Sequence, residues 1–99
     1  MDAPGLTPKT EKRLSLLFAP AYQERARTIL VEECGTSIPG WNAAGLERLR
    51  FAVLKLSGGK LDRLEAAIHD AKRDFRDVLM AADFGEPDSY TRWTPKRNW

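Results

Sequence analysis

The sequence has few of the residues on which most enzymes and secreted domains depend. Its 99 residues include one cysteine, Cys34, and one histidine, His69. A single cysteine cannot form a disulfide within the chain, which excludes a small secreted domain held together by disulfides. One thiol and one imidazole are also only two potential metal ligands, whereas a structural zinc site usually takes four. We therefore expect no disulfide, no metal and no other cofactor.

Long hydrophobic runs are missing as well. Apolar runs such as residues 16–19 are far shorter than the roughly 20 residues that a membrane-spanning helix needs. The first residues, 1–5, have no basic region followed by an apolar stretch, so they do not resemble a signal peptide. We expect a cytoplasmic protein that does not use a membrane.

The sequence also lacks a strong excess of charge of one sign, because 16 basic and 14 acidic residues leave a net charge of +2. A protein that binds nucleic acid by neutralising phosphates usually has a concentrated basic face. The nearest approach to such a face is Arg48, Arg50 and Lys55, followed by Lys60 and Arg63. Nucleic acid is therefore not the expected partner. As the alternative function we keep a small nucleic-acid-associated regulator, which would use the basic residues of the third expected helix.

What the sequence does have is helical periodicity. With 42% hydrophobic and 30% charged residues, it is typical of a globular protein, and we take residues 1–99 as a single helical domain. Residues 1–7 are expected to form a loose leader. Thr7 followed by Pro8 is typical of a helix start, and Pro20 predicts the start of a second helix, in which apolar residues recur every three or four positions.

The second half predicts the two most strongly patterned helices. Residues 38–40 favour a turn, Asn42 is the expected start of the third helix, and Gly58 and Gly59 end it. The fourth helix, residues 60–84, has apolar residues at alternating steps of three and four, as in a coiled-coil seam. These are Leu61, Leu64, Ile68, Ala71, Phe75, Val78 and Ala82. We predict an all-α fold, a small bundle of about four helices in which the last two form a hairpin that the first two close.

A polar and aromatic tail, residues 86–99, follows the fourth helix. Tyr90 and Trp93 are expected to fold back over the open side of the bundle, since large aromatic side chains are costly to leave in water. Alternatively, this end and Trp41 together form a contact surface, because Trp, Tyr and Arg are enriched at interfaces. The two predictions are compatible if Trp93 packs on the bundle and Trp99 remains exposed.

Two segments of the sequence resemble a known group of proteins. Residues 54–59 (LKLSGG) and residues 74–79 (DFRDVL) together are similar to a family of short bacterial proteins of unknown function, which share this hairpin and the aromatic end that follows it. The resemblance covers about residues 46–93. It implies a bacterial, cytoplasmic, helical protein, and it supplies no activity, ligand or functional residue.

Candidate catalytic groups are few. Glu65 and His69 share a helix face with Asp62, but a solvent-facing position on a charged helix explains this histidine without a metal. Residues 35–40 lack the second glycine of a nucleophile elbow and have no strand before them. Cys34 belongs to the apolar stripe of its helix, as a buried and inert thiol would, and it could pair with His69 only if the second and fourth helices bring the two together. We predict that the protein is not an enzyme.

The sequence thus favours a non-catalytic protein–protein interaction module. Its partner is expected to be another protein, or a second copy of the chain bound through exposed apolar surface on the fourth helix. The residues predicted to make the contact are Arg50, Arg76, Trp93 and Trp99.

Overall fold

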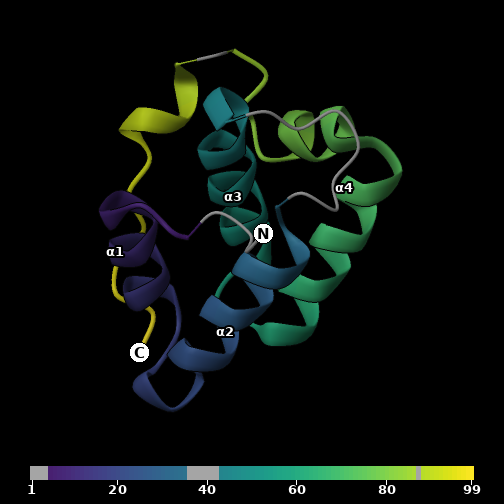
Figure 1. Cartoon of the computed structure of the whole chain (residues 1–99). Coiled ribbons are helices and arrows are strands. Elements are labelled where there is room, and N and C mark those ends of the chain that lie inside the picture. The colour runs from purple at the N-terminus through teal and green to yellow at the C-terminus, as the bar shows by residue number, and fades with distance from the viewer. Residues whose placement is uncertain (1–4, 36–42, 87) are drawn as a thin grey trace.

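The structure, a computed structural model, describes residues 5–35, 43–86 and 88–99. Within these residues the chain forms four α-helices and one short 3₁₀ helix (Figure 1). The elements are α1 (Pro8–Leu17), α2 (Pro20–Glu33), α3 (Ala43–Ser57), α4 (Leu61–Ala81) and η1 (Ser89–Arg92). The predicted all-α bundle of about four helices is confirmed. The predicted turn at residues 38–40, Asn42 and Trp41 lie outside the described residues.

The first two helices begin at prolines, as predicted. The side-chain oxygen of Thr7 accepts a hydrogen bond from the backbone N–H of Thr10 (3.2 Å), and Pro8 takes the first helical position, where no N–H is needed. Pro20 has the same place in α2, although no side chain caps that helix. Local sequence therefore fixes where α1 and α2 begin.

The helix α3 lies at the centre of the bundle (Figure 1). Residues 51–54 within it are fully buried, which agrees with the broad hydrophobic face that the sequence shows there. Its largest contact is with α4, and α1 packs against its other side. The helix α2 contacts both α1 and α4, so the first two helices close the α3–α4 hairpin as predicted.

The turn between α3 and α4 depends on two glycines. Gly58 and Gly59 both have positive φ angles, 57° and 85°, which side chains other than glycine seldom adopt. A Cβ atom on Gly59 would also collide with the side chain of Asn98 and the carbonyl of Leu17, whereas a Cβ on Gly58 would meet open space. Gly59 thus permits a close approach of three segments that are distant in the sequence.

The helix α4 differs from the prediction of one uninterrupted helix over residues 60–84. Its backbone leaves the helical conformation at Asp74 (φ −157°, ψ 100°), which divides it into two segments. The Asp74 carboxylate accepts a hydrogen bond from the backbone N–H of Arg76 (3.0 Å), as the side chain of a helix N-cap residue does. The predicted seam still faces the core, since Leu64, Ile68, Ala71, Val78 and Ala82 are buried. A cap within a helix leaves the apolar spacing intact, so the hydrophobic pattern does not reveal it.

The same helix also ends earlier than predicted. Asp83 has a left-handed conformation (φ 65°), and its N–H donates to the Met80 carbonyl (3.0 Å), while the N–H of Phe84 donates to Leu79 (2.8 Å). These are the two bonds of a Schellman motif, whose following residue often packs against the helix, and Phe84 is buried here. Gly85 suggested a later end because glycine is the usual residue in this conformation, which aspartate also tolerates.

The chain after η1 returns to the first helix. Residues 93–99, which we call the strap, run beside α1 toward its C-terminal end (Figure 1). The C-terminal segment is thereby brought beside the first helix of the sequence.

Candidate functional site

The predicted aromatic packing is present where η1 meets the core. Tyr90 lies edge-on to Phe51 at 5.1 Å between ring centroids, and Trp93 lies 6.2 Å from Phe51 and 5.9 Å from Phe84. The Tyr90 hydroxyl donates to a Glu47 carboxylate oxygen (3.2 Å), and burial, more than the nearby charge, raises the pKa of this phenol. Such ring pairs contribute about 0.5–1.5 kcal/mol each beyond the area that they bury. Tyr90 and Trp93 fold back on the bundle, as predicted.

Arg13 fastens the beginning of the strap to α1. Its Nε donates to the Trp93 carbonyl (2.9 Å), and its Nη2 donates to the Thr94 hydroxyl (3.3 Å). The remaining nitrogen donates to the Lys9 carbonyl (2.9 Å), and the guanidinium lies 4.5 Å from the centre of the Phe51 ring. Because the side chain is only 7% exposed, these contacts are made away from water. Arg13 therefore acts as a buried link between strap and core.

Asn98 fastens the end of the strap to two other segments. Its backbone N–H donates to the Leu16 carbonyl (2.8 Å), and its side-chain nitrogen donates to the carbonyls of Leu17 (3.3 Å) and Gly58 (3.1 Å). The last carbonyls of an α-helix have no partner within the helix. The strap supplies those partners at the end of α1, and it joins α1 to the α3–α4 turn.

Trp99 is held beside the same helix end, with much of its ring in solvent. The indole Nε1 donates to the Ser15 carbonyl (2.9 Å), and the Arg97 guanidinium stacks 4.2 Å from the ring centre. The side chain is 46% exposed. Trp99 thus has a defined position on the surface, rather than the unattached one that a polar tail suggests.

Five exposed cations lie on the strap and on the two segments that it joins, and we call them the basic surface. They come from α1, from the start of α4 and from the strap itself, and the bonds of Asn98 and Trp99 bring these segments together. The basic surface consists of Lys9, Lys12, Lys60, Lys96 and Arg97. Among the described residues, no carboxylate lies within ion-pair distance of any of them. Their charge is therefore not neutralised within this part of the protein.

The one acid on the exposed part of α1 points elsewhere. Both oxygens of Glu11 accept hydrogen bonds from the Arg27 guanidinium on α2, at 2.7–3.0 Å. This bidentate geometry is the strongest form of an Arg–carboxylate pair, and it raises the pKa of Arg27. The Glu11 carboxylate is therefore paired with a residue of α2 and does not neutralise the cations of the basic surface.

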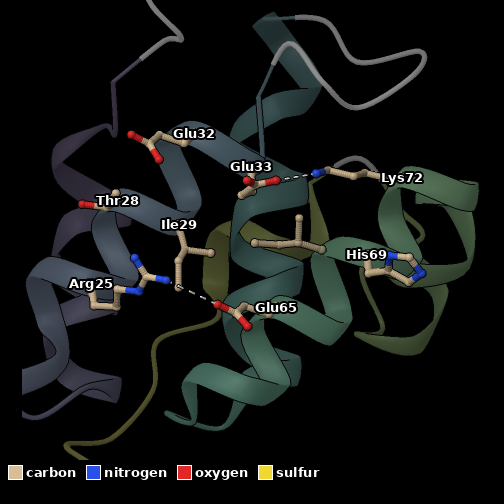
Figure 2. A pocket seen from close by; sticks show the side chains of 9 residues that line it. Arg25, Thr28, Ile29, Glu32, Glu33, Glu65, His69 and Lys72 are labelled. Atoms are coloured by element: carbon tan, nitrogen blue, oxygen red, sulfur yellow. Dashed lines mark hydrogen bonds and ion pairs between the residues drawn. The ribbon is translucent and has the colours of Figure 1, made fainter.

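A second candidate is a groove of about 280 Å³ between α2 and α4. Figure 2 shows Ile29 between two ion pairs, Arg25–Glu65 at 4.0 Å and Glu33–Lys72. Charges of both signs line the groove, and its cations already have carboxylate partners within the protein. It therefore has less unsatisfied charge to offer a ligand than the basic surface.

The two groups considered for nucleophilic catalysis do not form a site. Cys34 is fully buried, and burial raises the pKa of its thiol to about 12. A thiol with so high a pKa carries almost no thiolate at neutral pH and is a poor nucleophile. His69 lies exposed on α4, at the rim of the groove in Figure 2. The structure shows no bond between the two side chains within the described residues.

The predicted contact residues lie in four different settings. Arg50 is only 2% exposed, and its guanidinium donates to the carbonyls of Cys34 (2.9 Å) and Gly5 (3.0 Å), so we do not retain it as a contact residue. Arg76 is exposed on α4 and pairs with Asp74 (3.1 Å). Trp93 packs on the core and Trp99 is half exposed. Only the last two belong to the same segment.

Sequence reasoning missed most of the residues that build the strap. Arg13 and Asn98 fit no motif, because they bond to backbone carbonyls that are far away in the sequence. Lys9 and Lys12 are distant in the sequence from Lys96, so no local run of charge reveals that the segments carrying them lie side by side. An excess of bases over acids in both terminal segments was the only available signal.

Among the described residues, no group of three or more His, Cys, Asp or Glu side chains is placed to hold a metal ion. In that same part of the chain, every helix is too short or too polar to cross a bilayer. Comparisons with protein-family models, with curated proteins and with solved structures found no match. The resemblance to a family of short bacterial proteins stays a prediction.

Proposed function

We propose that this protein is a non-catalytic module that binds another protein through its strap. The observation that carries the proposal is Trp99, which is 46% exposed although its indole N–H is bonded to Ser15 and its ring is stacked by Arg97. Trp and Arg are the side chains most enriched at the energetic centres of interfaces. Because both side chains already have a fixed position, they would lose less conformational entropy when a partner binds.

The setting of the potential catalytic groups supports a role without catalysis. Cys34 is buried with a pKa of about 12, and His69 stands apart from it. For a bacterial origin and a cytoplasmic location, the support is the single cysteine and the family resemblance.

Self-association through α4 has less support than binding through the strap. Among the described residues of α4, Met80 is the only large hydrophobic side chain that is highly exposed, at 71%. One side chain is a small apolar area for a stable dimer interface. A second copy therefore ranks below a different protein as the partner.

The alternative of a nucleic-acid-associated regulator gains no support from α3. The Arg48 guanidinium donates to the Phe84 carbonyl (2.9 Å), and Lys55 donates to the Ala82 carbonyl (2.9 Å). With Arg50 buried, the three cations on which that alternative rested serve contacts within the protein.

Affinity purification of the tagged protein from its own cytoplasm, after nuclease treatment, tests the proposal. Deleting residues 91–99 would also remove Trp93 from the core, so Trp99→Ala is the cleaner variant. Tyr22→Ala is the matched control, because Tyr22 is an aromatic side chain of similar exposure (55%) on α2. We expect a stoichiometric protein partner that Trp99→Ala loses and Tyr22→Ala keeps. A partner that both variants keep, or recovery of nucleic acid alone, would contradict the proposal.

A further inference from the structure

The basic surface contains cations alone, which the small net charge of the protein does not indicate. Lys12, Lys96 and Arg97 come from opposite ends of the sequence, yet the segments that carry them lie side by side because the strap bonds to the carbonyls of Ser15 and Leu16. Elsewhere on the surface, cations are interspersed with acids, and the total is only +2. A local cluster of one sign attracts partners of the opposite sign and speeds their encounter.

The protein does not neutralise this cluster from within. The nearest acid on α1, Glu11, is bonded on both oxygens by Arg27, and Glu47 accepts from the hydroxyls of Thr7 and Tyr90. These bonds direct the two carboxylates into other contacts. The basic surface is therefore left to interact with carboxylates from outside.

Beside these cations, the strap also provides an apolar side chain, Trp99, and a directional hydrogen-bond donor, Arg97. The Arg97 guanidinium lies over the Trp99 ring, and stacking of this kind leaves the nitrogens at its edge available. A guanidinium edge matches the two oxygens of a carboxylate. The exposed part of the indole lies beside it, so an acidic side chain and a neighbouring apolar one could bind together.

The surroundings fit a short acidic peptide better than a nucleic acid. Asp62 is exposed two residues after Lys60, so a continuous phosphate backbone would meet an acid at that edge. Arg97 covers one face of the Trp99 ring, which reduces the area on which a base could stack. A peptide can place a few carboxylates on the cations and then leave the surface.

We propose that the basic surface and Trp99 bind an acidic segment of the partner protein, in which several Asp or Glu side chains flank an apolar residue. This inference rests on the proposed function above and adds the chemistry of the partner. Trp99 provides the apolar contact, Arg97 binds a carboxylate through its edge, and Lys12, Lys60 and Lys96 provide the charge.

Fluorescence anisotropy with labelled probes tests the inference directly. The probe is a peptide of about twelve residues, half of them glutamate, with two central leucines. We expect its affinity to fall about tenfold when NaCl rises from about 50 to about 300 mM, since exposed charges are screened over that range. The comparison probes are a peptide with lysine in place of glutamate and a single-stranded oligonucleotide of similar charge.

Two triple variants that remove the same charge provide the decisive contrast. The first is Lys12→Ala, Lys96→Ala and Arg97→Ala, and the second is Lys72→Ala, Arg73→Ala and Arg76→Ala, whose cations have acidic partners on or beside α4. We expect at least about a tenfold loss of affinity for the glutamate peptide in the first and less than about a twofold loss in the second. Circular dichroism verifies that both variants fold.

Several results would overturn the inference. Equal losses in the two variants would mean that only net charge matters. Tighter binding of the oligonucleotide, lost in the first variant, would identify the basic surface as a nucleic-acid site. Absence of measurable binding to the glutamate peptide would also contradict it. If the natural partner is lost with Trp99→Ala and kept by the first triple variant, the proposed function stands and only its acidic chemistry fails.

Discussion

Two sides of this bundle differ in whether their exposed cations have carboxylate partners within the protein. On the α2–α4 side, Arg25 and Lys72 each have a carboxylate within 4.0 Å on the facing helix. On the strap side, Lys12, Lys96 and Arg97 have none among the described residues. Both sides contain exposed cations, so composition does not separate them. The two sides therefore differ in which cations have carboxylate partners and not in the number of cations.

The two sides also differ in how their segments are held. The strap is attached mainly by side-chain donors to backbone carbonyls, from Arg13 and Asn98, while α2 and α4 meet through apolar contacts beneath their ion pairs. Bonds from buried or fixed donors should contribute more to stability than exposed ion pairs do. Mutations can test this contrast.

The largest effect is expected from Arg13→Ala. It removes three hydrogen-bond donors and the contact with the Phe51 ring, and it leaves the Trp93 carbonyl without its partner. We expect a loss of about 3 kcal/mol in the free energy of unfolding, measured by urea denaturation. Arg25→Ala, on the other side, should change it by less than about 0.5 kcal/mol. Similar losses in the two variants would remove the contrast.

Gly59→Ala should have the next largest effect. Alanine is strained at the positive φ of both turn glycines, at a cost of about 1 kcal/mol, but only at Gly59 does the new methyl group also collide with Asn98 and Leu17. We expect a loss of about 2–3 kcal/mol for Gly59→Ala and about 1 kcal/mol for Gly58→Ala. An equal loss in both variants would show that the strap does not press on the turn.

A smaller effect is expected at the interruption of α4. Hydrogen bonds from Arg76 lower the pKa of Asp74, so this carboxylate adds stability above the ordinary pKa of about 3.8 and loses it as pH falls through the lowered value. Asp74→Ala should lower the urea midpoint at pH 7, whereas Asp74→Asn should keep the cap and lose its share of the acid dependence. Denaturation at pH 7 and near pH 3 measures both. A midpoint that Asp74→Ala leaves unchanged would mean that the cap is not what divides the helix.

The smallest effect is expected for the labelling rate of Cys34, which tests whether the strap stabilises the end of α2. Because the thiol is buried and its pKa is about 12, labelling by a thiol reagent at pH 8 should require a local opening of the end of α2. Deleting residues 94–99 should leave that labelling rate within about threefold of the original, since α2 makes no bond to the strap in the described structure. Fast labelling in the deletion variant would show that the strap stabilises both sides equally.

The sequence predicted local features well wherever neighbours in the chain decide them. The cap at Thr7, the prolines that begin α1 and α2 and the glycines after α3 all follow from the preferences of single residues. It failed at Asp74, because a cap within a helix leaves the apolar spacing intact, and at Asp83, because aspartate there adopts the left-handed conformation that glycine more often takes. The packing of Trp93 was predicted from the cost of exposing an aromatic ring, while the burial of Arg50 was not.

The amino-acid sequence is enough to predict an all-α bundle, the start of its first two helices and the burial of the α3–α4 seam, because periodicity and capping act within a few residues. Which cations are neutralised depends instead on how the segments pack in three dimensions. Glu11 pairs with Arg27, and the strap that carries Lys96 lies beside the helix that carries Lys12, so both outcomes depend on where α1, α2 and the strap meet. Charges interact through space rather than along the chain, so the basic surface exists only once the strap is bound to α1.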